Sequence, residues 1–262
     1  MNELEGRTAL VTGASSGLGV DFARELGDRG AALVLVARRE GRLHDVALEL
    51  RQRCKVRVDV LVVDLGQRGA AQSVFDDLQG RGIDVDILVN NAGFGAHGDF
   101  IDLPWDREEQ MLNLDILALV HLTKIFSVPM VARGWGRILQ VASVGAFQPC
   151  PTYASYGAAK AFVLNFSEAF HFELRGSGVS CTVISPGATA TEFLDVSGQK
   201  PTLVHRLTMM TSASVGRIGV RSLLAQKVSV VPGLVNKLAA FSARFTPRLI
   251  ATWGAWYSMR AS

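Results

Sequence analysis

A glycine-rich turn near the N-terminus, Thr12–Gly19, lies between a short apolar run and a longer amphipathic segment. The apolar run, Thr8–Val11, predicts a buried strand, and Leu18–Arg29 has the apolar spacing of a helix. The glycines of the sequence T-G-A-S-S-G-L-G allow a tight turn and a close approach of the backbone to its surroundings. Such a turn between a strand and a helix is typical of the first unit of a doubly wound parallel sheet.

The alternation of short apolar runs and amphipathic segments continues along most of the chain. The runs are rich in Val, Ile and Leu without strict alternation, as in strands that are covered on both faces of a parallel sheet. Further strands are predicted at Ala32–Val36, Val56–Val63, Ile87–Val89, Arg137–Val141, Ser180–Ile184 and Val228–Val231. Further helices are predicted at Gly41–Arg51, Ala70–Gln79, Trp105–Arg133, Ala154–Arg175 and Ser212–Ala225. The pattern predicts an α/β fold, a doubly wound parallel sheet with helices on both faces, in one domain that spans residues 1–262.

The composition of the 262 residues is that of an ordinary globular protein, with 48% apolar and 19% charged residues. The three cysteines, Cys54, Cys150 and Cys181, are widely spaced and form no C-x-x-C pair. This spacing argues against a disulfide framework or a metal site and fits a reducing cytoplasm. Met1–Gly6 lacks the basic and apolar regions of a signal peptide, and no uninterrupted apolar stretch approaches the length of a membrane span. We therefore expect neither a leader nor a spanning helix.

The net charge of +3 conceals an asymmetry, because Asp195 is the last acidic residue. The basic residues that follow it are Lys200, Arg206, Arg217, Arg221, Lys227, Lys237, Arg244, Arg248 and Arg260. Such a basic segment is typical of contact with a membrane surface, an acidic carrier protein or a phosphorylated substrate. Alternatively, it is a solvated basic face that balances acidic residues elsewhere in the fold. We expect no nucleic-acid partner.

The glycine-rich turn also predicts a nucleotide cofactor. Free backbone N–H groups at the start of the following helix can hold a pyrophosphate, and Ser15 and Ser16 add hydroxyl donors. After the second strand, where an NAD site has an acidic residue for the ribose, the chain has Arg38 and Arg39. A guanidinium group suits a 2′-phosphate. These residues predict NADP(H) rather than NAD(H), the alternative being a ligand-free turn with two surface arginines.

The ends of the third and fourth strands complete this predicted cofactor site. Asp64, which Leu65 follows, can accept a hydrogen bond from the adenine amino group. The fourth strand ends in the sequence N-N-A-G, whose small residues let the backbone pass the adenosine ribose. We expect Asn90 to be mainly structural. The cofactor is expected to contact Asn91, Ala92 and Gly93.

A tyrosine and a lysine in the predicted helix Ala154–Arg175 have the spacing of a general acid/base pair. Tyr156 and Lys160 lie one turn apart on one helix face, and Ser143 lies upstream of them. A phenol has an ordinary pKa of about 10, and a nearby ammonium group lowers that pKa because it favours the phenolate. Since Y-x-x-x-K occurs by chance on many helix faces, its meaning depends on the nucleotide site that precedes it.

Five motifs in this order make the chain resemble the classical short-chain dehydrogenase/reductase family, in its NADP(H)-dependent type. They are T-G-x-x-x-G-x-G at Thr12–Gly19, N-N-A-G at Asn90–Gly93, Ser143, Y-x-x-x-K at Tyr156–Lys160 and P-G-x-x-x-T at Pro186–Thr191. The resemblance spans most of the chain and implies a Rossmann-like domain with a sheet of about seven strands. It also implies hydride transfer between a nicotinamide and the carbon of a carbonyl or an alcohol.

The resemblance implies a role for each matching residue. Tyr156 would exchange a proton with the substrate oxygen, and Ser143 would donate a hydrogen bond to that oxygen. Lys160 would hold the nicotinamide ribose and lower the pKa of Tyr156. The expected cofactor contacts are Gly13, Ser15, Ser16, Gly17, Leu18, Gly19, Arg38, Arg39, Asp64, Leu65, Asn91, Ala92, Gly93, Tyr156, Lys160, Pro186, Gly187, Thr189 and Thr191. Tyr153 has no ammonium partner and is expected to wall the pocket.

One position departs from the family pattern. The family has an asparagine in the long helix before Ser143, where its backbone carbonyl holds a water that leads to the lysine. In this chain Asp115 takes that place, whereas Asn113 lies two residues earlier, toward the opposite face of the helix. The backbone carbonyl survives the change, but a carboxylate can compete with Tyr156 for Lys160. We therefore include Asp115 among the candidate catalytic residues.

The substrate pocket is expected at Gly93–Ala96, Val144–Pro151 and Thr189–Met210, the last of which interrupts the strand–helix rhythm and is interpreted as a lid. The apolar residues there are Phe94, Phe147, Phe193, Leu194, Leu203, Leu207, Met209 and Met210. They predict a hydrophobic, bulky ketone or secondary alcohol as substrate, unless several of them are core or subunit contacts. The candidate substrate contacts are Ser143, Phe94, Phe147, Tyr153 and Phe193. Within the lid, His205 and Arg206 can anchor a carboxylate.

The segment 233–262 is longer than the family requires, and apolar and basic residues interleave in it. Three explanations stay open: a helix packed on the domain, a subunit contact, and a helix in the interface of a membrane. The resemblance also implies a homodimer or homotetramer. The leading function is NADPH-dependent reduction of a lipophilic ketone. The alternatives are a 3-oxoacyl reductase acting on carrier-bound or CoA-linked chains, and a non-enzymatic NADP(H)-binding or scaffold protein.

Overall fold

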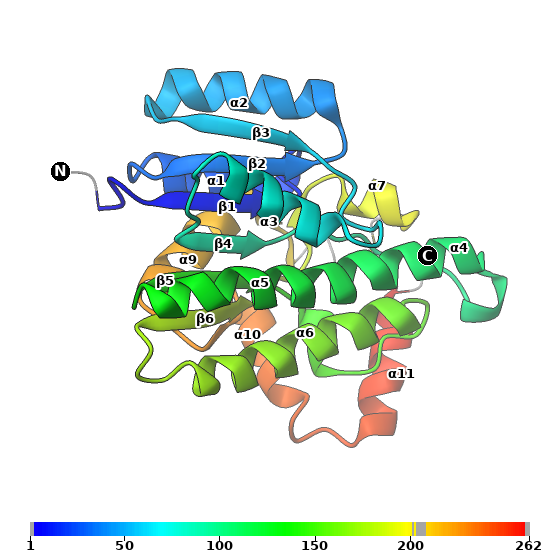
Figure 1. Ribbon diagram of the computed structural model, residues 1–262. Helices are drawn as coiled ribbons and strands as arrows, with labels where there is room; N and C mark the ends of the chain where they lie inside the picture. The colour runs from blue at the N-terminus through cyan, green and yellow to red at the C-terminus, as the bar shows by residue number, and fades with distance from the viewer. Residues whose placement is uncertain (1–2, 201, 203–207, 260–262) are drawn as a thin grey trace.

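Seven short runs of mostly apolar residues form one parallel sheet in the computed structural model, which describes residues 3–200, 202 and 208–259 (Figure 1). The strands are β1 Thr8–Thr12, β2 Ala32–Ala37, β3 Val58–Val62, β4 Ile87–Asn90, β5 Gly136–Val141, β6 Val179–Ile184 and β9 Ser229–Val230. Their order across the sheet is β3-β2-β1-β4-β5-β6-β9. The predicted doubly wound α/β fold is confirmed, and each strand begins and ends within two residues of its predicted bounds.

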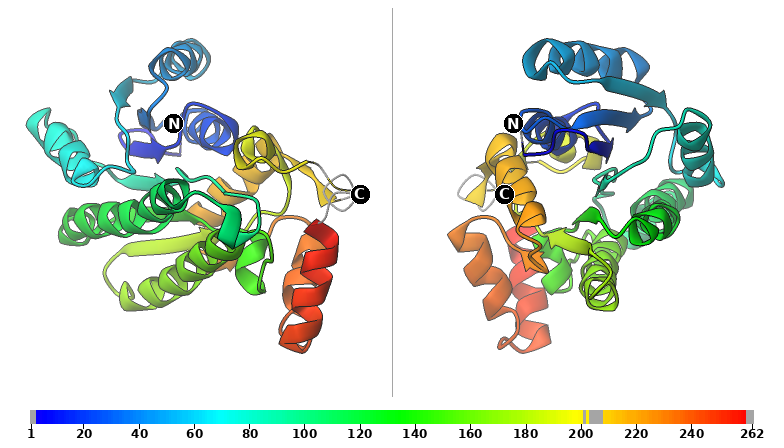
Figure 2. Two further views of the ribbon diagram at one scale, coloured as in Figure 1. Left: turned by 90° about the vertical axis from the view of Figure 1, so that its right-hand side faces the viewer. Right: turned by 60° about the vertical axis from the view of Figure 1, so that its left-hand side comes forward.

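Helices cover both faces of the sheet because each presents an apolar side to it (Figures 1 and 2). One face is covered by α1 Gly17–Gly27, α2 Glu40–Cys54 and α9 Ser212–Leu224. The other face is covered by α3 Ala70–Gly80, α5 Leu119–Ala132 and α6 Ala154–Glu173. Phe22 of α1 and Phe126 of α5 are the largest side chains buried in the two layers. The predicted helices agree with these bounds to within three residues, except that the predicted helix Trp105–Arg133 begins 14 residues before α5.

The direction of the connections reverses between β1 and β4, and a crevice opens at the carboxyl ends of strands at such a switch point. Thr12, the last residue of β1, ties the two strand ends together. Its Oγ1 donates to the carbonyl of Val89 at 3.2 Å and accepts from the backbone N–H groups of Asn91 and Ala92, both at 2.9 Å. The backbone on both sides of the crevice is therefore fixed.

The long helix Trp105–Ala132 changes its winding midway. It begins as α4 Trp105–Leu112, continues as a π-helical segment at Asn113–Ala118, and ends as α5. Within the described residues, this helix alone is long and apolar enough by composition to cross a membrane, and 44% of its apolar window is buried. It packs against β4, β5, α3 and α6, which is the environment of a core helix. The π-helical segment is the more informative feature, because such segments are frequent at functional sites.

The predicted lid and the C-terminal segment form separate additions at the edge of the sheet (Figure 2). The lid contains β7 Thr189–Ala190, which pairs with β8 Met210–Thr211, and a short helix, α7 Phe193–Ser197. The predictions for Leu203, His205, Arg206 and Leu207 concern residues outside the described part of the chain. The C-terminal segment forms a hairpin of two helices, α10 Leu234–Ser242 and α11 Arg248–Met259. The amphipathic extension predicted from residue 233 is thus two helices rather than one.

Candidate active site

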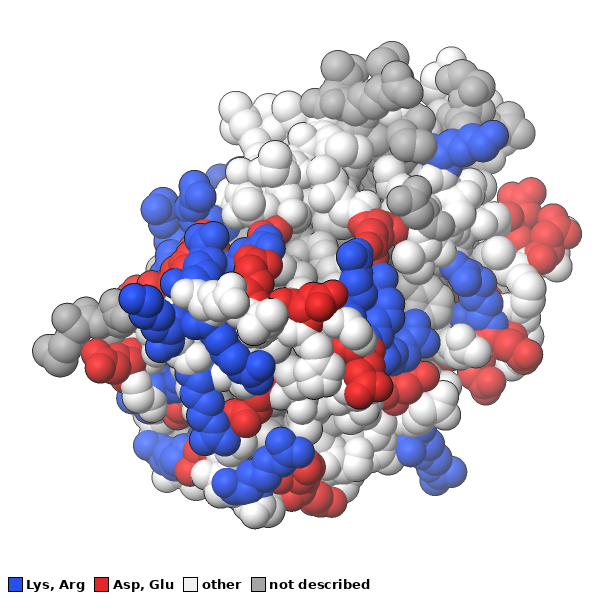
Figure 3. All heavy atoms as spheres, turned by 90° about the horizontal axis from the view of Figure 1, so that it is seen from above, with Lys and Arg blue, Asp and Glu red and all other residues white. Residues whose placement is uncertain are grey.

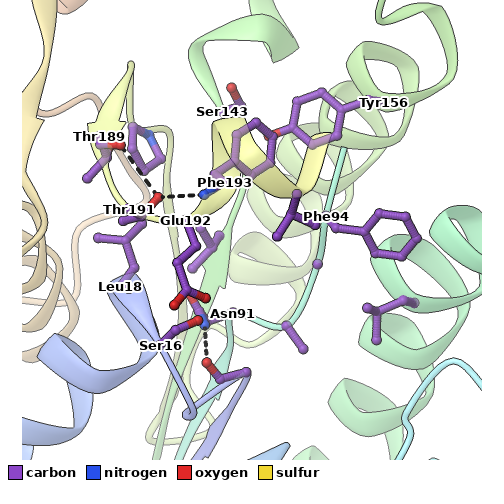
Figure 4. A pocket seen from close by; sticks show the side chains of 18 of the residues that line it. Ser16, Leu18, Asn91, Phe94, Ser143, Tyr156, Thr189, Thr191, Glu192 and Phe193 are labelled. Carbon is purple, nitrogen blue, oxygen red and sulfur yellow. Dashed lines mark hydrogen bonds between the residues drawn. The ribbon is translucent and has the colours of Figure 1, made fainter. Parts of the chain in front are cut away.

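A cavity of about 470 Å³ lies at the carboxyl ends of β1, β2, β4, β5 and β6. It extends from the glycine-rich turn and the end of β2 to the start of α6, and the lid lies over it (Figure 4). Gly19 is the one predicted cofactor contact that does not line the cavity. The predicted contacts that do line it are Gly13, Ser15, Ser16, Gly17, Leu18, Arg38, Arg39, Asp64, Leu65, Asn91, Ala92, Gly93, Tyr156, Lys160, Pro186, Gly187, Thr189 and Thr191. The cavity therefore brings together residues that the sequence separates by nearly 180 positions.

The glycine-rich turn is held tightly against the end of β4. Asn91 Nδ2 donates to the carbonyl of Thr12 at 2.9 Å. A Cβ atom on Gly13, whose φ is +66°, would lie 2.8 Å from the same Nδ2 atom. A Cβ atom on Gly19 would overlap the carbonyl oxygen of Gly13, so Gly19 serves the close packing of turn and helix rather than the cavity wall. These contacts leave the amide groups at the start of α1 facing a cradle that suits a pyrophosphate.

Arg39, the second of the two arginines that follow β2, joins the glycine-rich turn to the lid. Arg39 Nε lies 3.3 Å from Ser15 Oγ, and Arg39 Nη2 lies 2.5 Å from Ser16 Oγ. Its Nη1 pairs with Glu192 of the lid at 2.8 Å, and Arg42 pairs with the other oxygen of Glu192, also at 2.8 Å. Figure 4 shows Glu192 extending from the lid toward Ser16. Hydrogen bonds from Arg39 lower the pKa of Glu192, so the lid places a carboxylate among the groups that suit a phosphate.

Arg38, the residue directly after β2, lies beside Asp64, the predicted adenine contact. Arg38 Nη1 is 3.7 Å from Asp64 Oδ2, and the Arg38 side chain is more than half exposed. Asp64 Oδ1 also accepts from the backbone N–H of Gly66 at 3.1 Å. Arg38 thus lies at the open rim of the cavity, whereas Arg39 is engaged by the turn and the lid.

Tyr156, Ser143 and Lys160 meet at the other end of the cavity. Figure 4 shows the rings of Tyr156 and Phe193 beside one another with Ser143 near them, and the centres of the two rings are 5.4 Å apart. Ser143 ends the turn after β5, where its Oγ accepts from the backbone N–H of Gly145 at 3.2 Å. Lys160 Nζ lies 5.6 Å from the centre of the Tyr156 ring. The predicted helical spacing therefore does place the phenol and the ammonium group side by side.

Lys160 has a second, closer partner. Its Nζ lies 2.8 Å from Asp115 Oδ2 and donates to the carbonyl of Val141 at 3.2 Å. Asp115 lies in the π-helical segment and is fully buried, and its Oδ1 accepts from the backbone N–H of Phe94 at 3.1 Å. Burial raises the pKa of Asp115, while Lys160 and the Phe94 N–H act in the opposite direction. Asp115 thus occupies the position from which it was predicted to compete for Lys160.

The pKa of Tyr156 was expected to be lowered, but in the structure it is raised. Burial raises the pKa of Tyr156 well above its ordinary range, and the nearby Asp115 carboxylate raises it further. A hydrogen bond with Ser143 acts in the opposite direction. The sequence predicted the competition of Asp115 for Lys160 but not the burial of Tyr156, which is the larger cause of the raised pKa and depends on the folded chain.

The wall beside Tyr156 is aromatic with a small polar cluster behind it. Phe94, Tyr153 and Phe193 line the cavity, as predicted. The Tyr153 hydroxyl lies 2.8 Å from Ser197 Oγ and 3.0 Å from Gln199 Oε1, and burial raises the pKa of Tyr153 to about 12. Tyr153 is therefore held as a neutral wall residue.

The prediction for Phe147 was wrong. Its side chain packs against a separate core cluster that includes Leu119, Ala142 and Val163, and it is not in the cavity wall. Met209 and Met210 are not in that wall either, and Met210 packs against the core. Phe147 is the last residue of the 3₁₀ turn Val144–Phe147, and its partly buried side chain contributes to the core.

Sequence reasoning missed several residues of the site. Cavity-lining residues that it did not single out include Cys150, Glu192, Gln199 and Met259. Gln199 Nε2 lies 3.4 Å from the backbone oxygen of Met259, so the end of α11 reaches the cavity. Cys150, Glu192 and Gln199 lie in segments that were expected to form the pocket, whereas Met259 lies outside them and reaches the cavity because the C-terminal hairpin folds back.

Comparison with known proteins identifies the family. The family model described as short chain dehydrogenase matches residues 7–201, which contain the turn, Ser143, Tyr156 and Lys160. The chain belongs to the short-chain dehydrogenase family. It is therefore an oxidoreductase, and the resemblance noted in the sequence is confirmed.

Individual members of the family resemble this short-chain dehydrogenase along most of its length. Very-long-chain 3-oxoacyl-CoA reductase of Anas platyrhynchos is 32% identical over 225 residues, which make up 83% of this chain and 70% of that protein. A structure of 7β-hydroxysteroid dehydrogenase matches with a TM-score of 0.88 and 27% identity, over 98% of this chain and 100% of that one. A short-chain dehydrogenase from Sphingobium yanoikuyae in complex with NADPH matches with a TM-score of 0.82 and 30% identity, over 97% and 96% of the two chains. The residues of the cavity fit a nicotinamide cofactor of this kind.

Proposed function

We propose that this short-chain dehydrogenase uses NADP(H) to interconvert a hydrophobic, bulky ketone and its secondary alcohol, with Tyr156 as general acid/base. The observation that supports this proposal most strongly is the single cavity, which has phosphate-binding groups at one end and Ser143, Tyr156 and Lys160 at the other. The cavity wall is largely apolar, and the rings of Phe193 and Tyr153 lie 5.4 Å and 5.5 Å from that of the candidate acid, Tyr156. The likeness to 7β-hydroxysteroid dehydrogenase over the whole chain supports a bulky substrate.

The proposed mechanism starts from a protonated Tyr156. Because burial and Asp115 raise its pKa, the phenol holds its proton near neutral pH and can act as an acid toward a carbonyl oxygen. Ser143 donates a second hydrogen bond to that oxygen and stabilises the negative charge that develops there. A bound NADPH supplies the hydride. Lys160 stabilises the phenolate that remains after proton transfer.

The preference for NADP(H) over NAD(H) rests on the residues after β2. Arg39 is already surrounded by two serine hydroxyls, and Arg42 adds a second guanidinium group within reach of Glu192. A 2′-phosphate carries the negative charge that suits these guanidinium groups, whereas a ribose 2′-hydroxyl group carries none. The NADPH complex of the Sphingobium yanoikuyae relative supports this choice.

Two other functions are tested against the leading one. Reduction of 3-oxoacyl groups linked to CoA or a carrier is favoured by the relative from Anas platyrhynchos and by the basic C-terminal segment. A non-catalytic NADP(H)-binding role would give Ser143, Tyr156 and Lys160 no chemical function.

We propose that the enzyme works in the reducing cytoplasm, in keeping with its three free cysteines, Cys54, Cys150 and Cys181. We also propose that it is a homodimer or homotetramer.

The deciding experiment is a carbonyl panel assayed with NADPH and with NADH. Bulky aryl and steroid ketones should support oxidation of NADPH much faster than oxidation of NADH. Turnover of 3-oxoacyl-CoA alone would establish the second function, and equal use of NADH would contradict the role given to Arg39. If no carbonyl in the panel is turned over while NADPH still binds, the non-catalytic role is the correct one.

A further inference from the structure

The C-terminal hairpin turns its large apolar side chains outward. On α10 these are Leu234, Val235, Leu238 and Phe241, between 58% and 73% exposed. Phe245 follows in the turn, and on α11 the outward side chains are Leu249, Ile250, Trp253 and Tyr257, between 62% and 82% exposed. On each helix they recur at intervals of three or four residues and so form an exposed apolar stripe along that helix, and the stripes of α10 and α11 are together called the apolar stripe.

The inner side of the hairpin is made of small and polar residues. Asn236, Ala240 and Ala255 are the buried residues of the two helices. Asn236 anchors α10, because its Nδ2 donates to the carbonyl of Pro232 at 3.0 Å and its side chain fills the space beside Gly187. The polarity of the hairpin is thus the reverse of that of a helix that buries its apolar side on the domain. An apolar surface of this size on a folded chain marks a binding surface.

The charges around the apolar stripe all have one sign. Between residues 228 and 259 the chain has three charged residues, Lys237, Arg244 and Arg248, and all three are basic and exposed. At the opposite edge of the molecule, over α2, basic and acidic side chains are interspersed (Figure 3). The absence of acidic residues is therefore a property of the chain after Asp195, which includes the hairpin, and not of the whole surface.

We propose that the hairpin α10–α11 docks on an anionic lipid bilayer. With 9 and 12 residues, the two helices are far shorter than the roughly 20 residues that a span needs, so they lie in the interface plane. The apolar stripe enters the boundary between headgroups and acyl chains, and Trp253 and Tyr257 have the amphipathic rings that favour this depth. Lys237, Arg244 and Arg248 contact anionic headgroups.

Charge favours the bilayer over a second copy of the chain on the same surface. In a two-fold contact of hairpin on hairpin, the same surface of both copies would meet. Lys237, Arg244 and Arg248 of each copy would then face one another with no acidic residue on either hairpin to balance them. An anionic lipid surface supplies that balance over the whole stripe.

Docking would also bring the cavity close to the lipid. The helix α11 that exposes Trp253 and Tyr257 ends at Met259, which lines the cavity. A lipophilic ketone dissolved in the bilayer would then reach the site without crossing bulk water, a consequence that rests on the function proposed above. The docking itself is inferred from the hairpin alone, so the vesicle-binding test is independent of the reaction that the enzyme catalyses.

The test is co-sedimentation of the full-length protein with vesicles of phosphatidylcholine and with vesicles of equal parts phosphatidylcholine and phosphatidylglycerol. The wild-type protein should pellet with the anionic vesicles, and added salt should weaken the binding. The double substitution Trp253→Ser and Tyr257→Ser should weaken binding at least about tenfold. The triple substitution Lys237→Gln, Arg244→Gln and Arg248→Gln should weaken it about a hundredfold, or about fivefold for each basic residue.

The matched controls lie on α2 and directly after it. Leu48→Ser removes an apolar side chain that is 55% exposed, and Lys55→Gln removes an exposed basic one. Both should bind vesicles like the wild type, and all variants should keep their melting temperature and NADPH binding. Absence of wild-type binding, equal binding to both vesicle types, or unchanged binding of the hairpin variants would overturn the proposal. So would hairpin variants that change only the sedimentation velocity, since that result identifies a second copy as the occupant.

Discussion

Lys160 Nζ lies 2.8 Å from Asp115 Oδ2, and both side chains are buried. The ammonium group that family resemblance assigns to Tyr156 is therefore shared with a carboxylate. The sharing has an electrostatic consequence, because a negative charge near a phenol opposes its ionisation. It also has a structural one, because Asp115 joins the long helix to Phe94, at the edge of the cavity.

Replacement of Asp115 by Asn should shift the pH dependence of alcohol oxidation toward lower pH. Oxidation needs the phenolate of Tyr156, so activity rises with pH through the pKa of that group. Removal of the carboxylate removes one cause of the raised pKa and should move this limb by about one pH unit. The measurement is kcat/KM against pH with a saturating cofactor.

The control for this substitution is Asp99→Asn, which removes an exposed carboxylate. Asp99→Asn should leave the pH profile in place. An unchanged limb in Asp115→Asn, with the fold intact by circular dichroism, would show that Asp115 has no electrostatic influence on Tyr156.

Replacement of Tyr156 by Phe should lower kcat by about 10²–10⁴-fold, because the reaction loses its proton donor. NADPH affinity should change little. The matched variant is Tyr153→Phe, which removes a hydroxyl that is bonded to Ser197 and Gln199 and that has no ammonium partner. Tyr153→Phe should affect KM more than kcat, and a loss of kcat equal to that of Tyr156→Phe would contradict the roles assigned to the two tyrosines.

Replacement of Glu192 by Gln should tighten NADPH binding by about two- to fivefold, as expected for the loss of exposed ion pairs. The carboxylate pairs with Arg39 and Arg42, and a 2′-phosphate must compete with it. NADH affinity should stay the same, since NADH has no phosphate there. Fluorescence titration with both cofactors measures the difference, and an equal gain for NADH would rule out competition at the phosphate.

Replacement of Gly19 by Ala should destabilise the protein by about 1–3 kcal/mol and weaken cofactor binding, because the new methyl group overlaps the carbonyl of Gly13. The matched variant is Gly41→Ala in α2, where a Cβ atom meets nothing within 4 Å. Gly41→Ala should be neutral or stabilising by up to about 1 kcal/mol. Urea unfolding of the two variants gives the comparison, and equal stabilities would refute the packing argument.

Local sequence patterns were sufficient for the scaffold of the site. The turn at Thr12–Gly19 and the pair Tyr156 and Lys160 depend on residues close in sequence, and strand and helix periodicity place both at the same edge of the sheet. The arginines after β2 follow from the same topology. These features were therefore predictable, and the structure brings them into one cavity.

What the sequence missed depends on long-range folding. The contact of Glu192 with Arg39 spans 153 positions, and its lid segment has no strong periodicity of its own. Phe147 was misplaced because an aromatic residue four positions after the candidate serine, Ser143, suits a pocket wall and a core equally well. The outward orientation of the hairpin's apolar stripe could not be predicted either, because hydrophobic periodicity identifies the apolar face of a helix but not whether that face packs on the domain or faces solvent.

The position of Met259 has a practical consequence for handling the enzyme. Because Met259 lines the cavity, a purification tag fused after residue 262 would begin three residues along the chain from a residue of the cavity wall. The strand β1 begins at the end of the sheet opposite to the cavity (Figure 1). Kinetic constants and vesicle binding should therefore be measured on protein tagged at the N-terminus, with the tag removed for comparison.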